Sequence, residues 1–232
     1  MNSETPQFLP LRTIKSYVIR AGRMTAAQKQ ALATLWPRYG LDPQAGLLEP
    51  DRAFPRPAPL ILEIGFGMGD SLAGMARARP ERNYLGVEVH RPGVGNILRL
   101  AQEQELDNLR VYQADAKDVL TRCIAPDSLA GIQIFFPDPW PKKRHHKRRL
   151  IQPDFVQELR RCLQPGGYLH LATDWQPYAD YMLAVMSEAP GFRNAFGRGN
   201  WAGRGERPPT KFELRGQKLG HGVRDLVFIR EE

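Results

Sequence analysis

Cysteine is scarce in this sequence of 232 residues, which contains only Cys123 and Cys162. Two cysteines exclude a fold built on several disulfides and a cysteine-rich zinc module, and each is expected to be a small buried hydrophobic residue. No run of about 18 apolar residues occurs, so we expect no membrane-spanning helix. The first twenty residues carry charged side chains and no long apolar stretch, which is untypical of a secretory signal. We therefore expect a cytoplasmic protein.

Acidic residues are in the minority, since 25 Asp and Glu face 33 Lys and Arg and the formal net charge is +8. Such an excess is typical of proteins that bind polyanions, although a solvated basic surface is the alternative. The positive charges are clustered, because six of them fall within the eight residues from 142 to 149 and no acid interrupts them. His145 and His146 lie within this basic run, but they are adjacent and have no third ligand nearby, so no metal site is expected.

The chain divides into an N-terminal extension, residues 1–59, and an α/β domain, residues 60–232. The extension contains a predicted helix that starts at Thr25 and a proline-rich loop from Gly40 to Pro59. In the domain, predicted helices alternate with short apolar strands at Leu60–Ile64, Tyr84–Val89, Leu109–Gln113, Ile132–Phe136, Tyr168–Ala172 and Leu226–Ile229. This alternation predicts a parallel sheet covered by helices on both faces, with ligands bound beyond the carboxyl ends of the strands.

A glycine-rich loop follows the first predicted strand and contains Gly65, Gly67 and Gly69. Glycines permit a tight turn and a close approach of a ligand to the backbone. The spacing differs from the Gly-x-Gly-x-x-Gly of dinucleotide sites, because Asp70 stands where the third glycine would be. Glu63 precedes the loop by two residues and favours a ligand with ammonium or hydroxyl groups over a pyrophosphate. An ordinary glycine-rich turn is the alternative.

Two further acids follow the next strands. Glu88 comes 19 positions after Gly69, close to the offset at which an acid binds ribose hydroxyls in nucleotide-binding folds. Asp115 follows the third strand, where a helix N-cap is the alternative. Three acids at successive strand ends, together with the glycine loop, resemble the class I S-adenosylmethionine-dependent methyltransferases. This resemblance implies a Rossmann-like, mostly parallel seven-stranded sheet, and a cofactor whose methionine part, ribose and adenine lie near Glu63 with the loop, near Glu88 and near Asp115, respectively.

The fourth strand is followed by Asp138, which two prolines flank and restrict, and then by Trp140 and the basic run. The indole offers a face on which a base can stack, and the cations offer contacts to phosphates. We expect an RNA site at this edge of the sheet, although a charged run is more often simply solvated. Asp174 and Trp175 repeat the pairing of an acid and an aromatic residue after the fifth strand.

Taken together, the motifs resemble those of bacterial-type tRNA (guanine-N7-)-methyltransferases. The matching segments lie at 62–69, 86–90, 137–145, 147–150, 172–175 and 210–213, and 20–25 also resembles the family. The resemblance extends from about residue 14 to the end of the chain, except for 41–59. The Asp-Pro-Trp segment with its basic tail is highly specific when joined to Thr-Lys-Phe-Glu at 210–213, whereas the glycine loop occurs in many methyltransferases.

The resemblance implies a role for each group of residues. The cofactor, S-adenosyl-L-methionine, would be bound by Glu63, Gly65, Gly67, Gly69, Glu88, Asp115 and Asp138. The substrate would be contacted by Lys142, Asp174, Thr210, Lys211, Phe212 and Glu213. The RNA would be bound by Arg144, His145, His146, Lys147, Arg148 and Arg149. The implied partner is tRNA, with the variable-loop guanine, position 46 in tRNA numbering, as the target; no metal and no obligate protein partner are expected.

Asp138 is the expected catalytic residue, with Asp174 as the second choice. Guanine N7 carries a lone pair and no proton, so its attack on a methyl group needs no general base, and an acid would instead stabilise the cationic product or hold the guanine edge. Three alternatives remain at this stage. They are a nicotinamide-dependent oxidoreductase, a methyltransferase acting on another atom of an RNA base such as an exocyclic amine, and a non-catalytic RNA-binding protein on the same scaffold.

Overall fold

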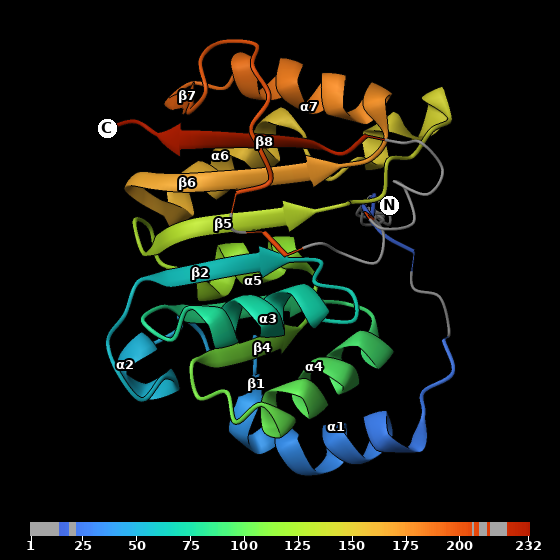
Figure 1. Ribbon diagram of the computed structural model, residues 1–232, viewed down its shortest axis with the longest axis vertical. Coiled ribbons are helices and arrows are strands. Elements are labelled where there is room, and N and C mark those ends of the chain that lie inside the picture. The colour runs from blue at the N-terminus through green and yellow to red at the C-terminus, as the bar shows by residue number, and fades with distance from the viewer. Residues whose placement is uncertain (1–13, 19–21, 206, 209–212, 214–221) are drawn as a thin grey trace, which may run out of the picture.

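The computed structural model describes residues 14–18, 22–205, 207–208, 213 and 222–232. An eight-stranded sheet runs through its centre, with strands in the order β1-β4-β3-β2-β5-β6-β8-β7 (Figure 1). The strands are β1 (Gly40–Leu41), β2 (Leu60–Ile64), β3 (Asn83–Glu88), β4 (Leu109–Gln113), β5 (Leu129–Phe135), β6 (Leu163–Thr173), β7 (Phe192–Asn194) and β8 (Arg224–Arg230). All neighbouring pairs from β1 to β6 are parallel, whereas β8 runs antiparallel to both β6 and β7. The predicted mostly parallel sheet is confirmed, and β1 adds an eighth strand to the predicted seven.

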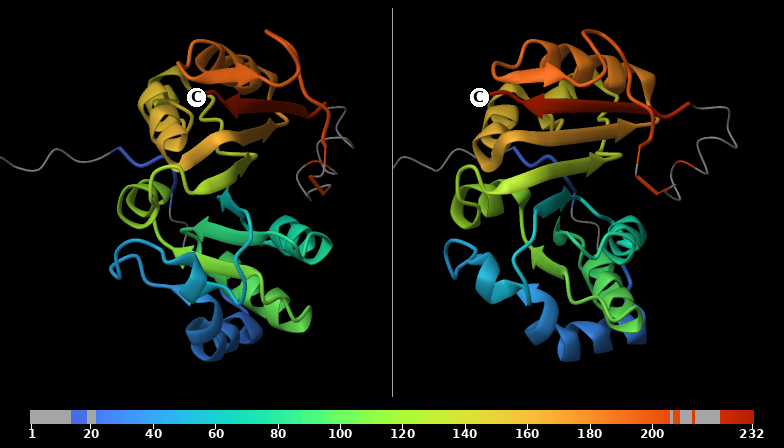
Figure 2. Two further views of the ribbon diagram at one scale, coloured as in Figure 1. Left: turned by 90° about the vertical axis from the view of Figure 1, so that its left-hand side faces the viewer. Right: turned by 60° about the vertical axis from the view of Figure 1, so that its left-hand side comes forward.

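Helices cover both faces of the sheet, as the side views of Figure 2 show. One hydrophobic core joins the sheet to α1 (Ala26–Tyr39), α3 (Asp70–Ala78) and α4 (Arg91–Glu103). A second core joins the opposite face to α5 (Ala116–Cys123), α6 (Pro153–Cys162) and α7 (Gln176–Ser187). Both cysteines lie buried in this second core, as the sequence predicts. A short helix, α2 (Pro50–Ala53), precedes β2.

The first helix begins where the sequence places its start. The Thr25 side chain accepts a hydrogen bond from the Gln28 backbone N–H, and the Gln28 side chain accepts one from the Thr25 N–H, which together form a capping box. The helix ends at Tyr39 and contains Pro37 in its last turn, where the missing N–H removes a single hydrogen bond. It packs against α4 and leads directly into β1, which pairs with β4. The segment that the sequence sets apart as an extension thus contributes to the sheet.

Part of one face of the sheet is covered by a loop, whereas a helix covers the other strands on that face. The crossing segment, which comprises residues 195–205 and 207–208 of the described chain, passes over β8, β6 and β5 on the face that also carries α3 (Figure 1). Ala202 forms an antiparallel bridge with Asp225 of β8. Pro208 lies close to Gly74 of α3. This crossing segment brings polar side chains against the ends of β5 and β6, next to the candidate active site.

Candidate active site

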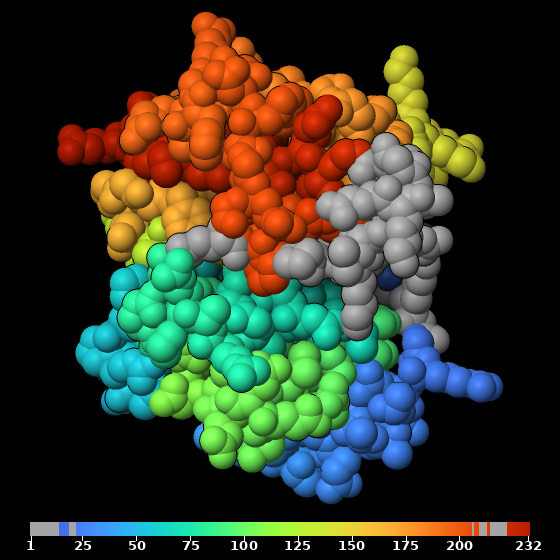
Figure 3. Space-filling model, in the orientation of Figure 1, coloured from blue at the N-terminus to red at the C-terminus, as the bar shows by residue number. Residues whose placement is uncertain are grey.

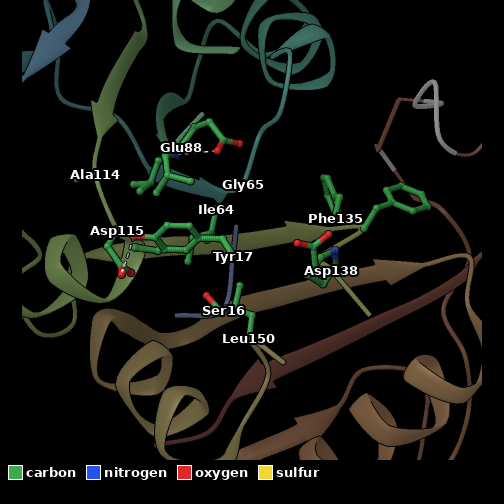
Figure 4. Close-up of a pocket in the computed structure, with 15 residues that line it drawn as sticks. Ser16, Tyr17, Ile64, Gly65, Glu88, Ala114, Asp115, Phe135, Asp138 and Leu150 are labelled. Carbon is green, nitrogen blue, oxygen red and sulfur yellow. Dashed lines mark hydrogen bonds between the residues drawn. The ribbon is translucent and has the colours of Figure 1, made fainter. Parts of the chain in front are cut away.

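A cavity of about 210 Å³ opens at the carboxyl ends of β2, β3, β4 and β5 (Figure 4). This is the edge at which the sequence predicts ligand binding. Gly65, Glu88, Asp115 and Asp138 line the cavity together with apolar side chains that include those of Ile64, Val87, Ala114, Phe135 and Leu150. Four of the seven residues expected to bind the cofactor therefore meet at one cavity.

The glycine loop has a left-handed backbone that leaves one side open. Gly65 and Gly67 have φ angles of 77° and 58°, in the region that favours glycine, and a Cβ added to either would have no atom of the described residues within 4 Å. A Cβ on Gly93 of α4, by contrast, would lie 1.9 Å from the Gly67 carbonyl oxygen. Gly69 faces α4 instead, since its Cβ would collide with Ile97 at 2.7 Å. The loop therefore combines close packing on its α4 side with free space at Gly65 and Gly67.

Glu88 ties the glycine loop to the end of β3. Its Oε2 accepts a hydrogen bond from the Gly67 N–H at 2.9 Å, and its Oε1 accepts from the N–H groups of Val89 and His90 at 2.7 and 2.9 Å. A carboxylate oxygen has capacity for more than one donor, so Glu88 remains able to accept from the hydroxyls of a ligand in the cavity.

Glu63 lies in β2 behind the cavity wall and is 2% exposed. Burial, reinforced by the negative charge of Glu88, raises the pKa of the Glu63 carboxyl to about 8. Its Oε2 has no hydrogen-bond partner among the described residues. Glu63 is thus a neutral acid at pH 7 with unused hydrogen-bonding capacity close to the glycine loop.

Asp115 caps a helix and also lines the cavity. As the N-cap of α5, its Oδ1 accepts from the Lys117 N–H at 3.1 Å. Its Oδ2 lies 2.8 Å from Lys15 Nζ and accepts from the Tyr17 hydroxyl at 3.3 Å. The carboxylate also lines the cavity. One side chain therefore both caps α5 and lines the cavity.

Residues 14–18, which we call the N-terminal strap, pass across the cavity. Ser16 and Tyr17 line it, and Figure 4 shows the Tyr17 ring lying among the other cavity residues with its hydroxyl toward Asp115. The Ser16 carbonyl oxygen accepts from Trp140 Nε1 at 3.0 Å, and the Lys15 carbonyl oxygen accepts from Arg148 Nε at 3.1 Å. Sequence analysis does not predict the strap, because every one of these partners lies about a hundred residues or more along the chain.

Asp138 occupies a strained turn after β5. Phe136 and Trp140 have φ angles of 52° and 46°, a region that residues other than glycine rarely adopt and that is enriched at functional sites. Asp138 stands between them with a proline on each side, and its side chain is exposed at the mouth of the cavity. The turn thus presents a carboxylate where a substrate arriving from solvent would meet the cavity.

The basic run forms a 3₁₀ helix, Lys143–Arg148, beside this turn. Its exposed cations are Lys142, Lys143, Arg144 and Lys147. The guanidinium of Arg148 lies 4.4 Å from the centre of the Trp140 ring. Arg149 differs from the rest because it is 4% exposed, donates to the Pro139 carbonyl oxygen at 3.0 Å and lies over the rings of three aromatic residues of the α7 region. One member of the run is therefore an internal residue.

The remaining expected substrate residues are placed separately. Asp174 directly follows β6 and is partly exposed, and neither it nor Lys142 lines the cavity. Thr210, Lys211 and Phe212 lie outside the described residues. Glu213 is 4% exposed, and its carboxylate pairs with Arg207 at 2.7 Å and with Arg204 at 3.5 Å.

Within the described part of the chain, no helix is long and apolar enough to cross a membrane. The same residues contain no group of three or more His, Cys, Asp or Glu side chains arranged to hold a metal ion.

Comparisons with known proteins identify the family. Residues 57–226 match the family model described as "Putative methyltransferase". The tRNA (guanine-N(7)-)-methyltransferase of Stutzerimonas stutzeri (strain A1501) is 55% identical over 229 residues, which cover 98% of this chain and 96% of that protein. The chain belongs to the tRNA (guanine-N(7)-)-methyltransferase family. A second member, from Alkalilimnicola ehrlichii (strain ATCC BAA-1101 / DSM 17681 / MLHE-1), is 56% identical over 223 residues, or 95% of this chain and 94% of that protein. The family predicted from the motifs is confirmed, and the alternative of a nicotinamide-dependent oxidoreductase is excluded.

Solved structures agree on the fold. The 16S rRNA methyltransferase KamB superposes with a TM-score of 0.55 at 14% sequence identity, covering 92% of this chain and 97% of that chain. A variant of the 16S rRNA (adenine(1408)-N(1))-methyltransferase from Catenulisporales acidiphilia, with its cosubstrate SAM, gives 0.53 at 16% identity, covering 83% and 92%. At these identities the likeness establishes the class I methyltransferase fold alone.

Proposed function

We propose that this chain transfers the methyl group of S-adenosyl-L-methionine to N7 of guanine in tRNA, at the variable-loop guanine, position 46. The observation that carries the proposal is the position of Asp138. Its carboxylate stands at the mouth of the cavity, and the turn that bears it continues directly into the exposed basic 3₁₀ helix. A methyl donor in the cavity and a guanine of an RNA bound along that helix would meet at this side chain.

The cavity fits the cofactor on three grounds. The open side of the glycine loop admits a ligand close to the backbone at Gly65 and Gly67. Glu88 and Asp115 supply carboxylate oxygens for ribose hydroxyls and for the adenine region, respectively, while Glu63 has an unpaired oxygen behind the loop. Apolar walls suit the purine and the thioether portion. When bound, S-adenosylmethionine supplies an electrophilic methyl group on a sulfonium centre.

This chain's own part in the reaction is positioning and charge stabilisation. Guanine N7 attacks with a lone pair that carries no proton, so no general base is required at the nucleophile. As the bond from N7 to the methyl carbon forms, the bond from that carbon to sulfur would break, leaving a neutral thioether and moving the positive charge to the guanine. The Asp138 carboxylate, held by its two prolines, would stabilise that charge without reorganising. Phe135 and Leu150 keep water from the reacting centre, because both are apolar and line the cavity.

The RNA is bound through its phosphates. Lys142, Lys143, Arg144 and Lys147 are exposed on one short segment and carry no acidic neighbour in the basic run. Such a segment neutralises backbone phosphates, and Trp140 beside it offers a stacking surface. Because tRNA is the substrate, we place the activity in the cytoplasm.

The test is methyl transfer from labelled S-adenosylmethionine to unmodified tRNA, with the product mapped by borohydride–aniline cleavage, which cuts at N7-methylguanine. A single cut in the variable loop is expected, and a tRNA with adenine at position 46 should remain uncut and unlabelled. Label without the cut would mean methylation of a different atom or base. Cofactor binding without label would mean a non-catalytic RNA-binding protein.

A further inference from the structure

Arg207 lies at the centre of a buried network of charged residues outside the cavity. Its side chain is fully buried, and its Nε and Nη2 donate to the two oxygens of Asp225, each at 2.9 Å. Its Nη1 donates to Glu213 Oε2 at 2.7 Å. His170 Nε2 lies 2.8 Å from Asp225 Oδ1 and completes the network. One guanidinium therefore joins β8 to Glu213, the last residue of the Thr210–Glu213 motif.

The same guanidinium supports the wall of the cofactor cavity. It lies 5.6 Å from the ring centre of Phe135 and 5.4 Å from that of Phe136, within the range of cation–π attraction. Both phenylalanines line the cavity. Phe136 has a left-handed backbone, and its N–H donates to the Ala172 carbonyl oxygen of β6 at 2.8 Å. The strained turn that carries Asp138 thus starts at a residue held from behind by Arg207.

The network is buried although a loop, and not a helix, covers the sheet at this place. Over β5, β6 and β8 the crossing segment takes the place that a helix takes over β2 and β3, and Figure 3 shows it lying against α3. Arg207 is the point at which this segment is fixed to the sheet by charge. Although burial alone would lower the pKa of Arg207 and raise that of Asp225, their hydrogen bonds outweigh burial, so the pKa of Arg207 is raised and that of Asp225 is lowered.

We propose that Arg207 is a positioning residue for methyl transfer: it ties Glu213 to β8 and supports the Phe135–Phe136 wall that leads to Asp138. The network joins parts of the chain that are otherwise separate, namely the end of β5, the start of β8 and the segment before β8. A guanidinium suits this role because its fixed fork can hold both oxygens of Asp225 and still reach Glu213, which the single ammonium of a lysine cannot do. The proposal rests on the proposed tRNA methylation.

The test compares R207K with the wild type. The lysine keeps the buried positive charge but loses the fork. We expect the single-turnover rate with saturating tRNA and cofactor to fall about tenfold or more, because small displacements of reacting groups have large effects on rate. Rates are referred to active protein, counted by the stoichiometry of cofactor binding in calorimetry. If R207K fails to fold, D225N replaces it, since it keeps the side-chain shape but offers the fork of Arg207 one oxygen acceptor in place of two, and the same fall in rate is expected.

A purely structural role would lower the melting temperature and leave the rate per active molecule within twofold of wild type, and that result would overturn the proposal. In a double-mutant cycle, R207K combined with E213Q should be no slower than the slower single variant, because both changes break one linkage. If the two single-variant reductions in rate multiply in the double variant, that result would also overturn the proposal.

R161K is the matched control, since Arg161 on α6 likewise donates to a carboxylate, Glu158, and to two backbone carbonyl oxygens. It should change stability without changing the rate. Failure of the wild type to methylate tRNA would reject the function itself, so the two failures are distinguishable.

Discussion

Trp140 Nε1 donates a hydrogen bond to the carbonyl oxygen of Ser16 at 3.0 Å, across 124 residues of sequence. The same indole carries the guanidinium of Arg148 on its face, and Arg148 in turn donates to the carbonyl oxygen of Lys15. The N-terminal strap over the cavity and the basic 3₁₀ helix are therefore held by one side chain. A displacement of the 3₁₀ helix would therefore also displace the strap, which forms part of the cavity wall.

Replacing Trp140 with phenylalanine should loosen the strap while keeping an aromatic face for Arg148. A hydrogen bond of this kind contributes about 0.5–1.5 kcal/mol, so local opening of the strap should increase about two- to tenfold. Lys15 has a side chain that is 45% exposed, so trypsin cleavage after it, followed by mass spectrometry, reports that opening. W201F is the control, since the Trp201 ring lies against the guanidinium of Arg224 at the start of β8. Equal cleavage rates in W140F and wild type would contradict the prediction.

Asp138→Asn should slow the chemical step while preserving the shape of the turn. Loss of the charge that faces the cationic guanine is expected to reduce the single-turnover rate by about 10- to 100-fold. The measurement uses saturating cofactor and tRNA, so that binding does not contribute. Asp51→Asn on the exposed surface of α2 should have no effect. A wild-type rate for the Asp138 variant would refute an electrostatic role.

The basic run should separate into residues that bind RNA and one that supports the fold. Arg144→Ala and Lys147→Ala should each weaken tRNA binding and flatten the log–log salt dependence by about 0.7–0.9 per lost phosphate contact. Arg149→Ala should lower the melting temperature without flattening the slope, because Arg149 is buried against aromatic rings. The prediction fails if the salt slope of Arg149→Ala changes as much as that of Arg144→Ala.

Glu63 should make the protein less stable as the pH rises. Its pKa is about 8 in the folded state against 4.5 for a glutamate free of such surroundings, so the folded protein holds the proton more tightly than the unfolded chain does. This contribution to stability is complete below pH 4.5 and is lost as the pH rises to 8. Glu63→Gln removes this pH-dependent loss of stability. Since one pKa unit corresponds to about 1.36 kcal/mol, the substitution should stabilise the protein at pH 7 by at most about 3 kcal/mol.

The measurement is the melting temperature of Glu63→Gln and wild type between pH 4.5 and 8. The difference between the two should grow with pH. Glu188→Gln, at an exposed position after α7, should show a constant difference. A difference for Glu63→Gln that is independent of pH would show that its carboxyl ionises normally.

Gly93→Ala should displace the glycine loop, because its methyl group would lie 1.9 Å from the Gly67 carbonyl oxygen, which belongs to the backbone and has to move. We expect the dissociation constant for S-adenosylmethionine, measured by calorimetry, to rise about tenfold or more. Gly74→Ala in α3 is the control, since among the described residues its methyl group would meet only Pro208, at 3.9 Å, and alanine favours the helix by about 0.5–1 kcal/mol. Equal affinities in the two variants would contradict this account.

The sequence predicts well what depends on neighbouring residues. The strands at Leu60–Ile64 and Leu109–Gln113 have the predicted bounds, because each is a short apolar run between turn residues. The cap at Thr25 also follows from local chemistry. The cavity edge is predicted because parallel strands end together, which places Gly65, Glu88, Asp115 and Asp138 at one side.

What depends on distant contacts could not be predicted. The pattern gives no signal for Tyr17, whose partner Asp115 is 98 residues away. It does not distinguish Arg149 from its basic neighbours, because the aromatic residues that bury it come from another element. The strands β1 and β7 are too short to show a period, and Arg207 carries no local motif. The catalytic and binding roles of the site residues stay predictions, which the substitutions at Asp138, Arg144 and Gly93 test.

The sheet ends on each side in a short strand, β1 with two residues and β7 with three. A long unpaired edge offers a row of backbone N–H and C=O groups to which a strand of another molecule can add. Here each outermost strand offers only a few such groups. A strand of a second copy would therefore find few such groups on either outermost strand, and the positive net charge that the two copies share opposes their approach.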